Sequence, residues 1–276
     1  MRIKNKLSAF LLSVLLCLLF LLLDQKLLVT EHYEIAVREL PKGYEGLRIV
    51  LLSDLHGASF GTDNGRLVER VGREKPDLIA LTGDFVCETG DAAAFASLLR
   101  QLRELAPCYY VSGNHEWAAH AMEKTAEILE ENDTVYLNNR YVILEKNGER
   151  LCLCGAEDPN SYAEMISPEE LVSDLRSREG TLPVVFLCHR NNSMEKTPSL
   201  DVDLILCGHS HGGIVRLPGA GGVLGVDRKL FPRYDAGLYS NDRYAMVVSR
   251  GLGTIHHIPR ICNFPEIAVV ELKKEA

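Results

Sequence analysis

The chain has 276 residues, of which 46% are hydrophobic and 25% are charged. Once the first two dozen residues are set aside, the remainder suits one α/β domain with a core of good volume. The formal net charge is −8, and because residues 1–24 carry a net charge of +2, the rest of the chain carries −10. A domain this acidic repels polyanions and lacks a basic stripe, so we expect no nucleic-acid partner.

The amino terminus predicts a membrane anchor. Residues 1–6 are basic, and residues 7–23 are uncharged and rich in leucine. With residues 24–29 the stretch reaches the roughly 20 residues that span a bilayer, and no small-residue cleavage site follows it. We therefore predict a cytoplasmic tip at 1–6, an uncleaved single-pass transmembrane signal anchor at 7–29 and a domain at 30–276. The domain should lie outside the cell membrane, because more basic residues flank the apolar run on its amino-terminal side than on its carboxyl-terminal side. A cleaved signal peptide and a buried core helix are the alternatives.

The rest of the chain alternates between strands and helices before it becomes strand-rich. We predict an edge strand at 33–40, a hairpin at 141–155 around Asn147-Gly148, and helices at 64–74, 92–105, 122–130 and 168–178. Ser167 and Glu170 form the sequence pattern of a capping box before the last helix. Five apolar runs bounded by Gly or Pro predict buried strands of a largely parallel sheet. This order indicates two sheets packed face to face with helices outside.

Eight cysteines raise a question about the outside location. Cys108, Cys152, Cys154, Cys188, Cys207 and Cys262 lie in apolar surroundings, so we predict that they are small buried hydrophobic residues of strands. Zinc binding by the 152–154 pair is disfavoured because no second pair has a suitable spacing. Free thiols outside a membrane indicate a reducing habitat or an inverted topology.

Five polar motifs follow the five apolar runs. They are DLH at 54–56, GD at 83–84, GNHE at 113–116, His189, and GHSH at 208–211. Ligands bind at the carboxyl ends of parallel strands, so these side chains should meet at one edge. A mixture of imidazole, carboxylate and amide donors suits a pair of divalent ions such as Mn, Zn, Fe or Mg. Two such ions about 3.5–4 Å apart act together on phosphate esters.

A single one of these motifs would mean little, because a lone Asp-x-His is usually surface or capping chemistry. Their conjunction decides the interpretation, since five of the nine histidines lie in these motifs. We therefore predict an enzyme with a binuclear metal centre.

The five motifs, in this order over residues 46–215, resemble the calcineurin-like metallophosphoesterase superfamily. The segments SDLHG and GHSHGGIVRLP, the region of Gly237 and Tyr239, GLG at 251–253 and the tail PEIAVVEL resemble its small bacterial membrane-anchored branch. The resemblance implies a four-layer α/β/β/α sandwich of two packed mixed sheets. It also implies Asp54, His56 and His211 on the first metal, Asp84 as the bridge, and Asn114, His189 and His209 on the second. His115 would face the substrate as the acid for the leaving group, with Glu116 beside it. Relatives commonly carry Asp at position 116, and many have His-x-Pro where this chain has His189-Arg190-Asn191.

Two further regions are candidates for substrate binding. Residues 216–243 show no clear regular element, and they combine Arg216, Arg228 and Arg233 with apolar side chains. This stretch is either a solvated surface excursion or a flexible rim that binds the substrate or dips into the bilayer surface. Arg260 is a second candidate phosphate clamp, because a guanidinium binds phosphate oxygens through two donors.

We predict a membrane-anchored hydrolase that cleaves phosphoester or pyrophosphate bonds with a metal-activated hydroxide. A membrane-proximal or lipid-linked substrate is the first hypothesis, and the resemblance keeps diacylglucosamine nucleotide pyrophosphates among the candidates. A broad phosphodiesterase or phosphomonoesterase of soluble substrates is the alternative. A catalytically silent binding module is disfavoured, because silent relatives usually lose a metal ligand and none is missing here.

Overall fold

A computed structural model describes residues 12, 25–86, 92–162, 165–255 and 258–275. Among them, no helix combines the length and apolar character needed to cross a membrane. The predicted anchor lies outside the described residues except for Leu12 and residues 25–29. Leu28 is buried in the domain core, and Val29 pairs with Glu266. The domain therefore includes residues 25–29, which the sequence alone assigns to the anchor.

The first sheet has six strands in the order β1-β14-β2-β3-β4-β5. Their bounds are β1 Val29–Val37, β14 Glu266–Lys274, β2 Arg48–Leu52, β3 Leu78–Leu81, β4 Cys108–Tyr110 and β5 Val135–Tyr136. All neighbours are parallel except β14 and β2. The predicted edge strand is confirmed as β1, whose outer side is the edge of the sheet.

The second large sheet also has six strands, in the order β12-β13-β9-β8-β7-β6. Their bounds are β12 Gly237–Ser240, β13 Ala245–Val248, β9 Leu204–Cys207, β8 Val184–Leu187, β7 Glu149–Gly155 and β6 Arg140–Lys146. The predicted hairpin is confirmed as β6 and β7, and Asn147 and Gly148 both have the positive φ that such a turn requires.

The stretch 216–243 is more regular than the sequence predicts. It contains β12 and a small two-stranded sheet of β10 (Arg216–Leu217) and β11 (Gly221–Gly222). β10 and β11 have only two residues each, and both residues of β11 are glycines. Strands this short show no alternation of apolar and polar residues, so the sequence pattern could not reveal these two.

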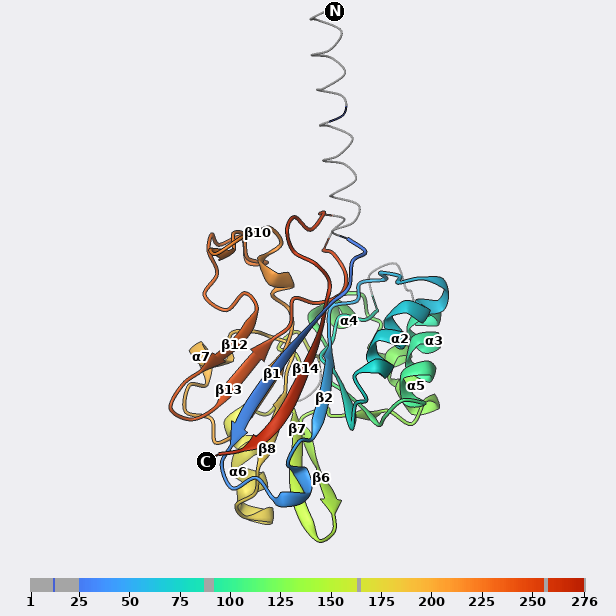
Figure 1. Ribbon diagram of the computed structural model, residues 1–276. Coiled ribbons are helices and arrows are strands. Elements are labelled where there is room, and N and C mark those ends of the chain that lie inside the picture. The colour runs from blue at the N-terminus through green and yellow to red at the C-terminus, as the bar shows by residue number, and fades with distance from the viewer. Residues whose placement is uncertain (1–11, 13–24, 87–91, 163–164, 256–257, 276) are drawn as a thin grey trace, which may run out of the picture.

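Helices cover the outer face of each large sheet (Figure 1). The first sheet carries α2 (Gly65–Arg73), α3 (Ala92–Arg103) and α5 (Met122–Glu131), and the second carries α6 (Pro168–Glu179) and α7 (Ser193–Lys196). The short helix α4 (Asn114–Ala118) and the 3-10 turns η1 (Lys42–Tyr44), η2 (Thr62–Asn64) and η3 (His211–Gly213) lie in connections. The predicted capping box of α6 is formed, because Ser167 and Glu170 each accept a backbone N–H of the other. This arrangement is the predicted four-layer sandwich.

The central strands are buried on both faces. In β2, Ile49 and Leu51 pack between the two sheets, whereas Val50 and Leu52 pack under the helices. In β9, Leu204 and Leu206 face the first sheet, and Ile205 and Cys207 face the helices of the second. A strand with two buried faces needs an uninterrupted apolar run, which explains why these strands are visible in the sequence.

The predicted burial of the cysteines is confirmed for five of them. Cys108, Cys152, Cys154, Cys188 and Cys207 are free and buried, and burial raises the pKa of the Cys152 thiol to about 12. Four of the five lie in strands, whereas Cys188 follows the end of β8. Cys262 is also free, but it is half-buried and lies in a loop with a φ of 52°, so its predicted place in a strand is wrong. Cys17 and Cys87 lie outside the described residues.

Candidate metal centre

The polar motifs meet where the two large sheets bring their strand ends together. Asp54 and His56 follow β2, Asp84 follows β3, and Asn114 and His115 open α4 just after β4. From the second sheet, His189 follows β8, and His209 and His211 follow β9. Because β2, β3, β4, β8 and β9 end at the same edge, residues up to 157 positions apart become neighbours there.

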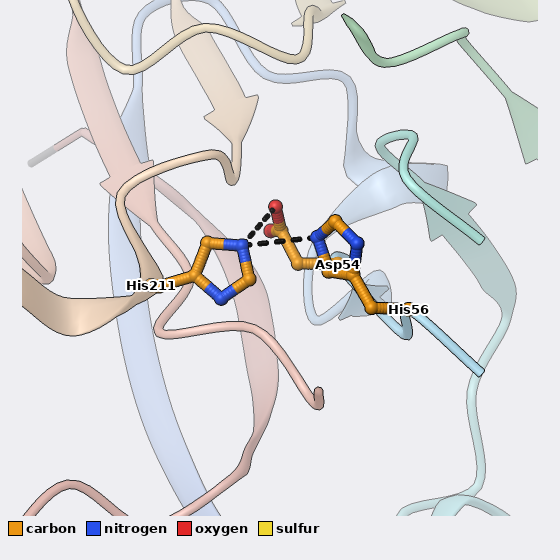
Figure 2. Close-up of side chains that lie close together, drawn as sticks. All are labelled: Asp54, His56 and His211. Carbon is orange, nitrogen blue, oxygen red and sulfur yellow. Dashed lines mark hydrogen bonds and ion pairs between the residues drawn. The ribbon is translucent and has the colours of Figure 1, made fainter. Parts of the chain in front are cut away.

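A first group consists of Asp54, His56 and His211 (Figure 2). The Nε2 atom of His211 lies 3.2 Å from Asp54 Oδ1 and 3.1 Å from His56 Nε2. Figure 2 shows this ring nitrogen turned toward both the carboxylate and the second imidazole. Three donor atoms that point at one place are the arrangement that holds a metal ion.

A second group consists of Asp84, His189 and His209, and Asn114 adjoins it. His189 Nε2 lies 3.2 Å from Asp84 Oδ2, 3.1 Å from His209 Nδ1 and 3.0 Å from Asn114 Oδ1. The other ring nitrogen, His189 Nδ1, lies 2.7 Å from the carbonyl of Thr82. If Nδ1 donates to that carbonyl, the lone pair of Nε2 faces the group, as in many metal-binding histidines.

Asp84 joins the two groups. Its Oδ2 atom lies 3.5 Å from His56 Nε2 and 3.2 Å from His189 Nε2, and a third group of potential ligands contains His56, Asp84 and His115. The structure thus brings together all seven residues that the sequence proposes as metal ligands. Their donor atoms are of the kinds that borderline divalent ions prefer.

Burial and charge give the centre an anionic character. Burial opposes the ionisation of Asp54 and Asp84, but the nearby imidazoles of His211 and His189 hold the pKa of each carboxyl below its usual value. Burial, together with His211, lowers the pKa of His56 to about 3, and burial and His189 lower the pKa of His209 well below its usual value. Asp54 and Asp84 are thus ionised, and the imidazoles of His56 and His209 are neutral, as metal ligands must be. His189 differs, because although burial opposes it, the charges of Asp84 and Asp54 raise its pKa to about 10, so a metal ion bound there would displace its proton.

The backbone of the centre is strained. Five of the seven proposed ligands, namely Asp54, His56, Asp84, His209 and His211, have φ between 44° and 66°. Non-glycine residues in this left-handed region cost on the order of 1–3 kcal/mol each, and they cluster at functional sites. Close packing enforces the geometry at Gly208, where an added Cβ would overlap the Ser53 hydroxyl and the Asp54 carboxylate.

Glu116 holds two of the motif loops together. Its buried carboxylate accepts backbone N–H groups from Asp84 at 2.9 Å and Gly113 at 3.0 Å through Oε2, and from Phe85 at 2.6 Å and Val86 at 3.2 Å through Oε1. Burial and the charge of Asp84 raise the pKa of Glu116 to about 7. The sequence places this residue only beside His115, whereas the structure makes it the residue that fixes Asp84 relative to α4.

His115 lies at the edge of the centre. Its backbone N–H donates to Asp84 Oδ1 at 2.8 Å, and its ring meets the ring of His56 edge to face, with centroids 4.6 Å apart. The His115 side chain lines a cavity of about 590 Å³ that also exposes Asp84, Asn114 and His211. This position agrees with the predicted place facing the substrate.

The two arginines predicted to bind substrate have structural roles instead. Arg260 is buried, and its guanidinium donates to the carbonyls of Gly253 and Arg250 at 2.8 Å each. Its donors are thus held inside the protein, so the predicted phosphate clamp is wrong. Arg216 donates to the Gly212 carbonyl at 2.8 Å and to Asp235 at 2.9 Å, which ties down the turn after His211.

Arg190 is the cation that the sequence analysis overlooked. It follows His189 directly, and its Nη1 lies 3.1 Å from His209 Nε2 on the wall of the cavity. Nε and Nη2 donate to the two oxygens of the buried Asp158 at 2.6 and 3.0 Å. No direct signal in the sequence marks it, because Arg190 occupies the unrestricted position of the His-x-Pro motif that many relatives have.

Comparison with known proteins shows which sequences and which fold this chain resembles. Residues 47–213 match the sequence model of the calcineurin-like phosphoesterases. The uncharacterized metallophosphoesterase YkuE of Bacillus subtilis is 27% identical over 259 residues, which cover 91% of this chain and 87% of the relative. The phosphodiesterase YaeI of Escherichia coli is 30% identical over 234 residues, 82% of each chain. The crystal structure of TT1561 from Thermus thermophilus has a TM-score of 0.50 at 14% identity, covers 75% of this chain and 90% of its own, and supports the fold alone.

Proposed function

Because this chain belongs to the calcineurin-like phosphoesterase family and is a metal-dependent hydrolase of phosphoesters, we propose that its substrates are membrane-proximal or lipid-linked. The hydrolase assignment depends on one observation above all others. Asp84 Oδ2 lies 3.5 Å from His56 Nε2 of the first group and 3.2 Å from His189 Nε2 of the second, so one carboxylate contacts both halves of the centre.

We assign Asp54, His56 and His211 to one divalent ion, Asn114, His189 and His209 to the other, and Asp84 to both. When bound, such ions activate water and neutralise charge on the phosphoryl oxygens. The metals are of the Mn, Zn, Fe or Mg kind, because the donor set combines imidazole with oxygen ligands. Glu116 keeps Asp84 in place through its four backbone contacts.

His115 is the proposed acid for the leaving group. It is on the cavity wall beside both groups of ligands, where it can deliver a proton to the departing oxygen. Arg190 is the proposed hydrogen-bond donor to a phosphoryl oxygen. Its guanidinium contacts His209 through Nη1, and its Nε donates to Asp158, which fixes its position. Its side chain is 26% exposed, so the cation remains accessible from the cavity.

The membrane part of the proposal depends on the sequence of residues 7–23 and on the place where the chain enters the domain. Gln25 exchanges two hydrogen bonds with the backbone of Arg260, at 2.8 and 3.0 Å. The neighbouring Ile261 pairs with Val215, four residues after His211. The amino-terminal segment therefore joins the domain beside the metal centre. A single-pass anchor here, with residues 1–6 in the cytoplasm and the domain outside the cell membrane, would hold the site close to the lipid surface.

Metal content and turnover test the catalytic part. The full chain, stripped with a chelator and then saturated with manganese or zinc, should bind two ions and hydrolyse bis(p-nitrophenyl) phosphate. At most one ion per chain, or no turnover with manganese, zinc, iron or magnesium, would contradict the binuclear assignment. Leu238→Asn, a change at an exposed site on β12, is the matched control that should leave both measurements unchanged.

Fractionation and proteolysis test the membrane part separately. The mature protein should stay with membranes through a high-salt wash, and protease added to intact, wall-stripped cells should digest the domain. Protection until lysis would invert the topology, and a shortened chain in the soluble fraction would identify residues 7–23 as a signal peptide.

A further inference from the structure

The cavity at the metal centre is lined by side chains of two chemical kinds. The polar kind includes Asp84, Asn114, His115, Arg190 and His209 of the centre, and Asp227 and Arg228 of the loop beyond it. Five aliphatic side chains, here called the aliphatic wall, complete the lining: Ile214, Leu224, Val226, Ile255 and Ile258. Aliphatic side chains cannot hydrogen-bond to phosphoryl oxygens. They gain only when an apolar group covers them, by about 25 cal/mol per Å² of area removed from water.

The aliphatic wall is built by defined backbone contacts. Leu224 and Leu230 form an antiparallel β-bridge, and the N–H of Phe231 donates to the carbonyl of Val223 at 2.9 Å. Asp235 accepts N–H groups from Gly222 and Ala236 and the hydroxyl of Tyr239, which ties the two ends of this loop together. The loop therefore presents Leu224 and Val226 to the metal centre in a fixed way.

A second cavity of about 330 Å³ adjoins the first. The two share Arg190, His209 and residues 225–227, so a group bound at Arg190 can extend into either one. The lining of the second cavity combines charged side chains, Glu195, Asp227, Lys229 and Arg233, with the apolar Leu230, Phe231 and Tyr234. A phosphoryl group held between the metal ligands and Arg190 thus has an aliphatic place for one substituent and a place with charged side chains for the other.

On the basis of the proposed function, we infer that this centre takes phosphodiesters with one alkyl or acyl substituent and one polar substituent. The apolar substituent lies against Val226, Leu224 and Ile258, and the polar one occupies the cavity beside Arg190. The aliphatic wall also leads to the surface near the amino-terminal segment. Ile258 is 43% exposed, and it lies two residues before Arg260 in the chain. The carbonyl of Arg260 accepts a hydrogen bond from the side chain of Gln25. An amphiphilic molecule in a lipid layer therefore meets the apolar wall first.

Chain length of the substrate tests this inference. The full chain in lipid nanodiscs, saturated with manganese, is assayed with p-nitrophenyl hexyl phosphate and p-nitrophenyl methyl phosphate. We expect kcat/KM to be about 10- to 30-fold higher for the hexyl diester, mainly through KM, because partial burial of five methylenes supplies this factor. The inference of a phosphodiester substrate adds a second expectation, that the methyl diester is a better substrate than the monoester p-nitrophenyl phosphate.

Two variants place the effect in the aliphatic wall. Val226→Asn and Ile258→Asn change partly exposed residues, and each should lower the hexyl-to-methyl ratio of kcat/KM at least about fivefold. Leu238→Asn is the control for an exposed aliphatic residue elsewhere, and it should leave the ratio unchanged. Partitioning of the hexyl diester into the nanodisc is the same for all four proteins, so it cancels in the comparison.

Binding without turnover gives an independent measurement. Hexylphosphonate should bind about tenfold more tightly than methylphosphonate in calorimetry, and Val226→Asn should remove the difference. Equal kcat/KM for the two diesters with active enzyme would overturn the apolar site but leave the hydrolase assignment intact. Faster cleavage of the monoester would overturn the assignment of phosphodiesters as the substrate. Failure of every substrate with metal-loaded enzyme would instead contradict the proposed function.

Discussion

The pair of Arg190 and Asp158 allows a quantitative test of how the centre is held together. Asp158 is fully buried and accepts from Arg190 through both oxygens. In Asp158→Asn, an NH2 group replaces one of these oxygens and faces a guanidinium that can only donate. Breaking a buried, charge-assisted pair costs about 3–5 kcal/mol, and partial exposure of Arg190 reduces this, so we expect a loss of about 2–3 kcal/mol in the free energy of unfolding.

A double-mutant cycle measures the coupling between the two side chains. Asp158→Asn, Arg190→Gln and the double variant are unfolded with urea in the same detergent as the unchanged chain, and the coupling energy should be about 2 kcal/mol. Arg176 and Asp201 are the control pair, with a similar 2.8 Å contact but an Asp201 side chain that is 65% exposed. Their coupling should stay below about 1 kcal/mol.

The kinetic part of the test asks whether Asp158 acts through Arg190. Each single variant should lower kcat/KM for a phosphodiester by about 10- to 100-fold, which corresponds to the loss of one charge-assisted contact to the substrate. The double variant should be no slower than Arg190→Gln alone. Additive free energies of unfolding, or a full kcat/KM in Asp158→Asn, would refute the view that the buried carboxylate positions this arginine.

Three further changes probe the centre and the adjoining loop. Asp84→Asn should reduce both metal content and turnover, because a shared carboxylate loses a charge and an oxygen donor; retention of two ions, measured by elemental analysis, would contradict this. His115→Asn should keep both ions and slow turnover by about 10²–10⁴-fold, with a smaller effect for substrates with good leaving groups. Equal slowing across a series of leaving groups would remove His115 from the role of acid. Asp235→Asn should cost about 2 kcal/mol of stability near pH 7, since the carboxylate accepts hydrogen bonds from Arg216 and Tyr239. Although burial opposes it, hydrogen bonds from Tyr239 and Gly222 and the charge of Arg216 lower the pKa of Asp235, so this contribution exists above its unfolded pKa of about 4 and disappears as the pH falls through the folded value. Urea unfolding of both proteins from pH 7 down to pH 3 should show the difference shrinking, and a constant difference would show that the lost stability is not electrostatic.

Much of this protein is determined by local sequence. The strands β2 and β9 are buried on both faces, so each appears as an unbroken apolar run that ends in a polar motif. Because parallel strands of one sheet bring their carboxyl ends to one edge, the order of the motifs was enough to place Asp54 beside Asp84. His209 follows β9 of the other sheet and joins them only through the packing of the two sheets. The capping box at Ser167 and the Asn147-Gly148 turn are equally local, since each requires only neighbouring residues.

Other features depend on contacts between distant parts of the chain. Arg260 carries the chemistry of a phosphate clamp, yet its donors are used by the carbonyls of Gly253 and Arg250 inside the protein. Arg190 occupies an unrestricted position of a motif, and only its contact with Asp158, 32 positions away, makes it a fixed cation of the site. Residue type alone shows which interactions a side chain can make. Only the tertiary structure decides which of its possible partners are close enough, and whether burial leaves any of its donors for a ligand.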